Sequence, residues 1–305
     1  MAHRPTMQPG MDRRVAQEYL PEGITSRRET IAAMFGFRRR RRARLRARPF
    51  PDGWNAVMER NVPYLRYLTP EERPELRGDI QVFLAEKRFE GCGGLKMTDE
   101  IRVTIAAQAC LLLLHRDNDD YPRLRSILVY PHHYFAPAYA EGPAGHVVEA
   151  LQDRLGESWS HGAVVLAWDS VRQGAAVIHD GHNLVLHEFA HQLDAENEYA
   201  DGIPILPRTS MFGPWARILG REYHDLVARV ARDRPTDIDP YGATNPAEFF
   251  AVVTEEFFER PIEMQAQHRE LYEELRLFYR QDPAERVRAV GAVPESGERF
   301  PLYPP

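Results

Sequence analysis

The chain has 305 residues, of which 43% are hydrophobic and 28% charged, a composition typical of a folded globular protein with a sizeable core. The longest apolar run, residues 101–114, is interrupted by polar residues and is too short to cross a bilayer. Residues 1–20 contain charges and prolines rather than a secretory signal. Only two cysteines are present, Cys92 and Cys110, so neither a disulfide framework nor a thiolate metal site is expected. We expect a cytoplasmic protein with no membrane span.

Charge is divided unevenly along the chain. The first 50 residues hold 13 arginines and four acidic residues, whereas the remainder is acidic. The run Arg38 to Arg48 could contact nucleic acid or an anionic surface. Because no aromatic residues alternate with the arginines, a solvated tail without a partner is favoured. We expect residues 1–49 to be a basic, largely disordered leader, with a short helix near 30–35.

The globular part is expected to begin with helices. Thr69 and Glu72 form a capping box that introduces a helix running to Phe89, and Thr98 begins a second helix through His115. Residues 127–130 and 163–168 have the composition of strands, and 145–155 is ambiguous between helix and strand. We expect 163–168 to be a sheet edge that pairs with an extended substrate; the alternative is an ordinary core strand.

The later elements are expected in a simple order. Residues 195–213 form a loop long enough to be a lid, and residues 214–233 form a helix with an apolar stripe. A last helix is expected from Pro261 to Tyr279, followed by a proline-rich tail over residues 283–305.

The strongest chemical pattern is His187-Glu188-x-x-His191, within an apolar helix over residues 183–194. Two histidines four residues apart share a helical face, so both rings can reach one Zn²⁺ at about 2.0–2.1 Å. Glu188 is rotated by roughly 100° and is placed to take a proton from a bound water. Asp194, which follows the motif, is a candidate to orient a ligand through a hydrogen bond.

A catalytic zinc site needs a third protein ligand. Asn245 reads as the N-cap of a second helix, which places Glu248 at its third position and Glu255 two turns later on the same face. Either glutamate could bind the metal, and Glu248 could instead be a capping-box carboxylate. His179, His182 and the pair His132-His133 are expected to have surface or hydrogen-bonding roles.

The residues 184–194 (L-V-L-H-E-F-A-H-Q-L-D) and 241–255 (Y-G-A-T-N-P-A-E-F-F-A-V-V-T-E) resemble the Mlc titration factor A (MtfA) zinc peptidases. The resemblance covers about residues 50–282 and implies that His187, His191 and Glu248 are the zinc ligands. It also implies that Tyr241 is an active-site residue and that the protein cleaves short substrates as an aminopeptidase does. A more distant similarity to lethal-factor-type zincins points to the same fold.

We therefore expect an α+β fold: a zincin-like catalytic domain over 50–282, with a small mixed sheet packed on the metal helix and a helical N-terminal part. One Zn²⁺ per chain would activate a water, with Glu188 as general base and Tyr241 as a donor to the oxyanion. The alternative function, also implied by the resemblance, is the binding of a transcriptional repressor of the Mlc type, with peptidase activity secondary.

Overall fold

The computed structural model describes residues 36–116, 121–132, 134–141, 147–154, 156–159 and 162–291. The chain divides into two units, residues 1–48 and 49–305. In the first unit, residues 36–46 are helical, although this arginine-rich stretch was expected to be disordered. The helix expected near 30–35 lies outside the described residues. Everything below concerns the second unit.

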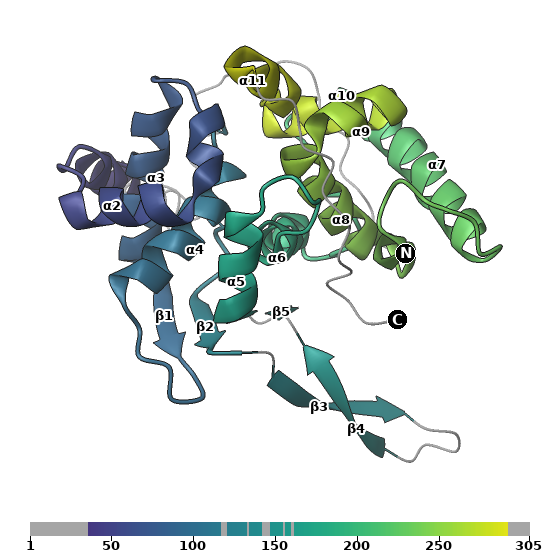
Figure 1. Ribbon diagram of the computed structural model, residues 1–305, viewed down its shortest axis with the longest axis horizontal. Coiled ribbons are helices and arrows are strands. Elements are labelled where there is room, and N and C mark those ends of the chain that lie inside the picture. The colour runs from purple at the N-terminus through teal and green to yellow at the C-terminus, as the bar shows by residue number, and fades with distance from the viewer. Residues whose placement is uncertain are drawn as a thin grey trace, which may run out of the picture. The chain divides into compact units, whose positions relative to one another are not determined.

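Helices make up most of the second unit (Figure 1). Their bounds, with short 3₁₀ helices marked η, are α2 Asp52–Asn61, η2 Pro63–Tyr67, α3 Glu72–Glu86, α4 Asp99–Leu111, α5 Trp168–Ala176, α6 Leu184–Asp194, η3 Ala195–Asn197, η4 Thr209–Met211, α7 Phe212–Val230, η5 Pro240–Ala243, α8 Pro246–Glu259, α9 Pro261–Gln267, α10 Arg269–Tyr279 and α11 Pro283–Val290. Within the described residues, no helix is both long enough and apolar enough to span a membrane.

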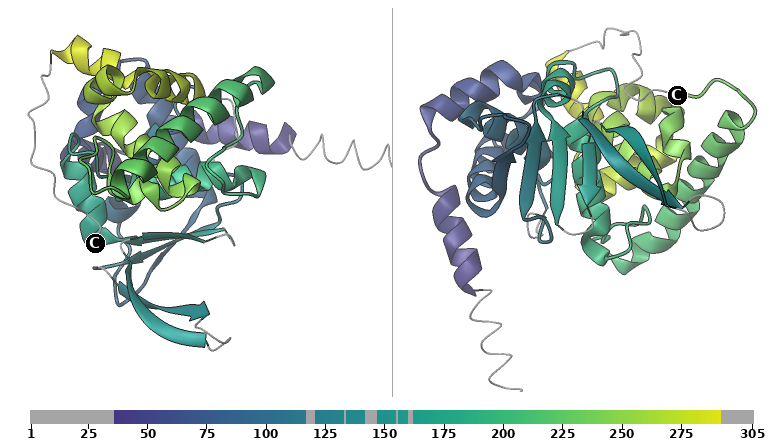
Figure 2. Two further views of the ribbon diagram at one scale, coloured as in Figure 1. Left: turned by 90° about the vertical axis from the view of Figure 1, so that its right-hand side faces the viewer. Right: turned by 90° about the horizontal axis from the view of Figure 1, so that it is seen from below.

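A four-stranded sheet has the order β1-β2-β6-β5, formed by Arg88–Gly91, Ser126–Tyr130, Ala163–Ala167 and Gly156–Trp159. The first three strands run parallel, and β5 is antiparallel to β6. The helices lie together on one face of this sheet (Figure 2). Strands β3 (Tyr134–Glu141) and β4 (Val147–Arg154) form a separate antiparallel pair, which shows that most of the ambiguous stretch 145–155 is extended.

The fold is α+β with a small mixed sheet, as expected, but the prediction that 163–168 forms a sheet edge is wrong. Strand β6 lies between β2 and β5, and Trp168 already belongs to α5. The alternative, a core strand, is correct: Val164, Val165 and Leu166 are at most 3% exposed. The edge beside β6 is β5, whose short Gly-Glu-Ser-Trp sequence gives little strand signal.

Helix α4 begins directly after its predicted cap Thr98, whereas α3 begins at Glu72, three residues after Thr69, and both helices end sooner than predicted. Thr69 N donates to Glu72 Oε2 over 2.9 Å in the expected capping box, and the Thr98 side chain caps α4. However, α3 ends at Glu86, and Phe89 lies in β1. Lys87 explains the break, because its ammonium donates to the carbonyls of Tyr121 and Leu124 and ties the chain to the segment before β2.

The C-terminal part also departs from the prediction. The expected helix 261–279 is divided into α9 and α10 at His268, whose φ and ψ of −126° and 53° are not helical. Residues 283–290 form α11, which packs against α9, instead of belonging to a tail. Asp282 caps α11 and Pro283 occupies its first turn, a helix start that the proline content concealed.

Helix α6 occupies the centre of this arrangement. It packs against α4 and α5 on one side and against α8 on the other, and it also contacts β5 and β6 (Figure 1). Its apolar side chains are at most 3% exposed; they are Leu184, Val185, Leu186, Phe189, Ala190 and Leu193. The Phe189 ring lies 4.9 Å from that of Tyr121 and 5.7 Å from that of Phe83, measured between centroids. This packing fixes the helix that carries the histidine motif.

Candidate metal centre

The first half of the site is built on α6. Asn183 caps the helix, because its Oδ1 accepts hydrogen bonds from the backbone amides of Val185 and Leu186, each over 3.1 Å. Four residues into the helix, His187 is 3% exposed, and one turn later the His191 ring lies 4.9 Å from the His187 ring, measured between centroids. The i, i+4 spacing therefore places both imidazoles on one face, as the sequence predicted.

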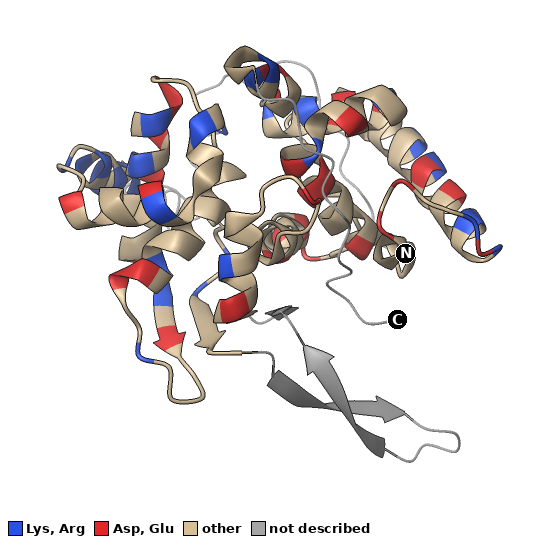
Figure 3. Ribbon diagram, viewed as in Figure 1, with Lys and Arg blue, Asp and Glu red and all other residues tan. Residues whose placement is uncertain are grey.

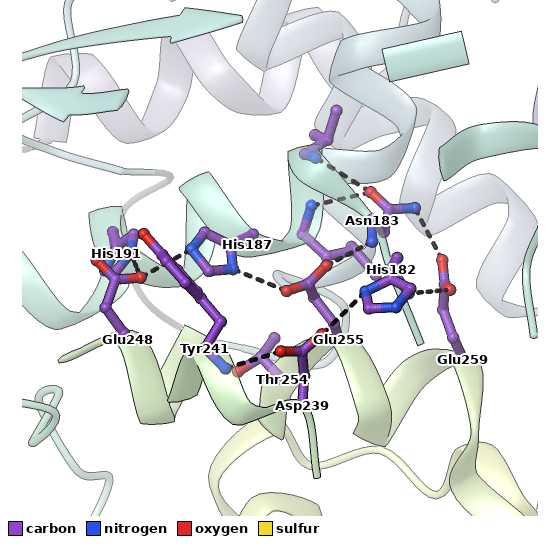
Figure 4. A network of polar contacts seen from close by, with 12 residues as sticks. His182, Asn183, His187, His191, Asp239, Tyr241, Glu248, Thr254, Glu255 and Glu259 are labelled. Atoms are coloured by element: carbon purple, nitrogen blue, oxygen red, sulfur yellow. Dashed lines mark hydrogen bonds and ion pairs between the residues drawn. The ribbon is translucent and has the colours of Figure 1, made fainter. Parts of the chain in front are cut away.

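The second half is built on α8. The Asn245 side chain accepts from Glu248 N over 3.0 Å, and Pro246 occupies the first turn, so the predicted helix start is confirmed. The Glu248 carboxylate does not serve the cap. Its Oε2 lies 3.0 Å from His187 Nε2 and 3.2 Å from His191 Nε2 (Figure 4).

Three potential ligand atoms therefore converge from α6 and α8. One ligand atom each from His187, His191 and Glu248 lies within 4.8 Å of the other two, and in the described part of the chain only these residues form such a group. Two imidazoles and a carboxylate are a donor set that zinc accepts, and it leaves a fourth tetrahedral position open. The residues present therefore fit a catalytic metal ion.

Glu255 lies behind this cluster rather than in it. Its Oε1 is 2.7 Å from His187 Nδ1, and its other oxygen accepts a hydrogen bond from Asn183 N. The carboxylate is 2% exposed. Because Nδ1 contacts Glu255, a neutral His187 ring that keeps its proton on Nδ1 has the Nε2 lone pair free to bind a metal ion. This orienting role was assigned to Asp194 by the sequence, and in the structure Glu255 performs it.

The electrostatics of the three residues favour a cation. Burial raises the pKa of Glu248, but its hydrogen bonds to both histidines outweigh burial and hold that pKa well below its usual range. Burial and the neighbouring His187 lower the pKa of His191. Burial also opposes charge on His187, yet Glu255 and Glu248 raise its pKa well above the usual value. Acidic residues are frequent on α8 (Figure 3), and the ionised carboxylate of Glu248 among them is a ligand that a divalent cation accepts.

Tyr241 lies beside the cluster on η5. Its ring centroid is 6.0 Å from that of His187, and Figure 4 shows the ring extending along His187 toward His191 and Glu248. The backbone amide of Tyr241 donates to Asp239 Oδ1 over 2.8 Å, which fixes the start of this 3₁₀ turn. Glu188 follows His187 on α6 and is 4% exposed. The structure thus brings Tyr241 to the three predicted ligands.

The other histidines lie outside the cluster. His182 is 7% exposed, and its Nδ1 lies 3.7 Å from Asp239 Oδ2. His132 Nδ1 pairs with Asp169 Oδ2 over 3.1 Å, and the structure does not describe His133. Neither His182 nor His179 belongs to the metal-binding group. These positions agree with the expected non-ligand roles.

Sequence reasoning did not find the polar network around the start of α6. Glu259 Oε2 accepts from the backbone amides of Gly181 and His182, and Glu259 Oε1 accepts from Asn183 Nδ2 over 3.0 Å (Figure 4). A helix start is a natural place for an acidic partner, because its first backbone amides have no acceptor within the helix. The signal was the repeat of acidic residues on α8 at 248, 255 and 259, which are two turns and then one turn apart on a helix whose other residues are mostly apolar.

Asp194 gives a pH-dependent prediction. It is fully buried, and burial raises its pKa from 3.8 to about 6. The folded state therefore holds this proton more tightly than the unfolded state, so wild-type stability decreases as pH rises from about 4 through about 6. In metal-free protein, the stability of Asp194→Asn relative to wild type should rise over this pH range and then level off. Urea unfolding at pH 4.5 and 7 tests this, and an equal stability difference at both pH values would contradict it.

Comparisons with known proteins agree with the site. Residues 37–280 match the family described as glucose-regulated metallo-peptidase M90. The protein slr2042 of Synechocystis is 44% identical over 245 residues, covering 80% of this chain and 89% of its own length. Mlc titration factor A of Klebsiella pneumoniae (strain 342) is 32% identical, with 78% and 90% covered, and that of Salmonella schwarzengrund is 30% identical, with 80% and 92% covered. The Mlc titration factor A proteins are thus relatives of this chain, and the chain belongs to the glucose-regulated metallopeptidase M90 family.

Proposed function

We propose that the protein is a zinc-dependent peptidase whose metal ligands are His187, His191 and Glu248. The observation that carries this proposal is the convergence of two Nε2 atoms and one Oε2 atom from two buried helices, with the motif glutamate Glu188 next to His187 in α6. When bound there, zinc would supply a water of lowered pKa and a Lewis acid for a peptide carbonyl.

The chain's own residues then handle the protons. Glu188 accepts a proton from the attacking water on its carboxylate and returns it to the amine that leaves, which is general acid–base catalysis. Glu255 keeps the Nδ1 proton of His187 in place, so that the Nε2 lone pair remains available to bind the metal. Tyr241 donates its phenolic proton in a hydrogen bond to the carbonyl oxygen as negative charge develops on it.

The substrate is proposed to be a peptide, with aminopeptidase-like cleavage of short chains as the MtfA resemblance implies. An extended substrate that adds a strand to the sheet near α6 would pair with β5, because β5 is the edge strand next to β6 and contacts α6. Backbone hydrogen bonds along a strand edge bind a peptide without regard to its side chains.

One experiment tests the metal and the reaction together. Purified protein should contain about one zinc per chain, and it should cleave members of a peptide library or an aminoacyl-anilide. A strong chelator should abolish cleavage, and stoichiometric zinc should restore it. A metal-free protein that cleaves at the same rate would contradict the proposal.

A second function is proposed from the relatives whose name is Mlc titration factor A. The protein would bind a transcriptional repressor of the Mlc type and sequester it. Binding of a purified repressor should be equal for wild type and for a catalytically silent variant, because capture requires no proton transfer. Absence of binding at micromolar concentrations would remove this function and leave the peptidase proposal intact.

A further inference from the structure

Gly202 occupies the point where three helices come together, two of which carry the candidate ligands. Its backbone amide donates to Asp194 Oδ2 over 2.8 Å, and its carbonyl accepts from Trp215 Nε1 over 3.2 Å. On its third side, Gly202 packs against the backbone of Pro246. One residue of the loop after α6 therefore touches the end of α6, the start of α7 and the start of α8.

Only glycine fits at this point, for two separate reasons. The φ of Gly202 is +80°, in the left-handed region that other residues rarely adopt. In addition, a Cβ atom at position 202 would lie 2.4 Å from the carbonyl oxygen of Pro246. That neighbour is backbone at the first turn of a helix, so it cannot rotate away as a flexible side chain would.

The contacts of Gly202 lie close to both halves of the metal centre. Asp194 is the last residue of α6, three residues after His191. Pro246 is the first residue of α8, two residues before Glu248. Asp194 and Pro246 are rigid parts of the helices that carry the candidate ligands. Because the Gly202 backbone lies between them, its lack of a side chain sets how closely the C-terminal end of α6 and the N-terminal end of α8 approach.

We propose that Asp194 and Gly202 are positioning residues for the metal centre, which hold Glu248 at binding distance from His191. The Asp194 carboxylate draws the loop against α6, and the bare Gly202 backbone lets α8 approach as closely as the cluster requires. The proposal gives Asp194 a role. The sequence predicted that Asp194 orients a metal ligand, whereas in the structure its carboxylate binds the loop at Gly202. The proposal rests on the proposed metal site.

The test is the zinc affinity of the full-length protein, measured by competition with a chromogenic chelator and without any substrate. Gly202→Ala should weaken zinc binding by about 10- to 100-fold, the usual cost of disturbing a group that orients ligands. Gly94→Ala is the matched control, because Gly94 has a φ of +82° with no atom within 4 Å of an added Cβ. Equal affinities of these two variants would overturn the proposal.

A second pair of variants guards against simple misfolding. Asp194→Asn retains an oxygen that can accept from Gly202 N, whereas Asp194→Leu has a similar volume and no acceptor. Zinc affinity should be near that of wild type for Asp194→Asn and reduced for Asp194→Leu in protein that unfolds cooperatively. If both variants bind zinc as wild type does, the Asp194 contact plays no positioning role.

Combination with Glu248→Gln separates this proposal from the one on which it rests. If Gly202 acts through Glu248, Gly202→Ala should weaken zinc binding far less in the Glu248→Gln background than in wild type. An undiminished effect in that background would show that Gly202 acts elsewhere. If Glu248→Gln alone leaves zinc affinity unchanged, the ligand assignment itself fails, whatever Gly202→Ala does.

Discussion

Replacement of Glu188 by glutamine is expected to lower peptide hydrolysis by about 10²- to 10⁴-fold, the usual contribution of a general acid–base group. Glutamine keeps the length and the hydrogen-bonding capacity of the side chain but cannot accept the proton of the attacking water. Since Glu188 lies outside the three-atom cluster, zinc content and the unfolding midpoint should stay close to those of wild type. The loss should therefore appear in kcat rather than in metal binding.

Glu90→Gln is a suitable control for this experiment. Glu90 is an exposed residue on β1, and its Oε2 lies 3.8 Å from Arg88 Nη2. The substitution makes the same chemical change away from the metal centre. Its hydrolysis rate should equal that of wild type. Undiminished hydrolysis by Glu188→Gln, in a preparation shown to be free of contaminating peptidase, would favour repressor binding as the main function.

Removal of Glu248 is expected to have the largest effect on the metal. Glu248→Ala deletes one of three ligands, so the protein should lose its zinc during gel filtration in the presence of a mild chelator. Glu255→Ala deletes the partner of His187 Nδ1 and should weaken zinc binding by about 10- to 100-fold, because the imidazole is then less well oriented. Zinc affinities from chelator competition should therefore rank wild type, Glu255→Ala and Glu248→Ala in decreasing order.

The reverse ranking of the two variants would mean that Glu255 is the ligand and that Glu248 has the supporting role. Each variant also needs its urea unfolding curve, because Glu255 is buried at the contact between α6 and α8. A variant that unfolds with a reduced slope would have lost compact structure, and its zinc affinity would not be compared.

The sequence was sufficient for the parts of the site that depend on local rules. The spacing of His187 and His191 follows from the helix repeat, and the cap Asn245 marks where α8 begins. Local rules could not separate Glu248 from Glu255, because residues seven apart lie on one helical face. The two carboxylates contact opposite nitrogens of the same imidazole, and only the three-dimensional arrangement of α6 and α8 shows that Glu248 also reaches His191.

Several of the errors share a physical cause, since each of them concerns a residue or strand whose hydrogen-bonding partner cannot be identified from its own local sequence. Nothing in the sequence of 156–159 predicts that it pairs with β6 and removes that strand from the edge. Lys87 ends α3 because it bonds to carbonyls 34 and 37 residues away. Asp194 fits the pattern of a ligand-orienting carboxylate, yet its acceptor oxygen serves Gly202. Tertiary contacts decide such cases, and short-range propensity does not record them.

The separation of the proposed metal ligands in the chain also determines when the centre could form during synthesis. Glu248 follows His187 by 61 residues and His191 by 57. At about 5–20 residues per second, a ribosome adds those residues in roughly 3 to 12 seconds, during which the nascent chain has both histidines but not Glu248. A half-site of two imidazoles binds zinc weakly, so the metal should enter only after α8 has been synthesised and has docked on α6. With the proposed ligands, zinc acquisition would be tied to one of the last steps of folding, and a chain truncated before residue 248 should emerge without metal.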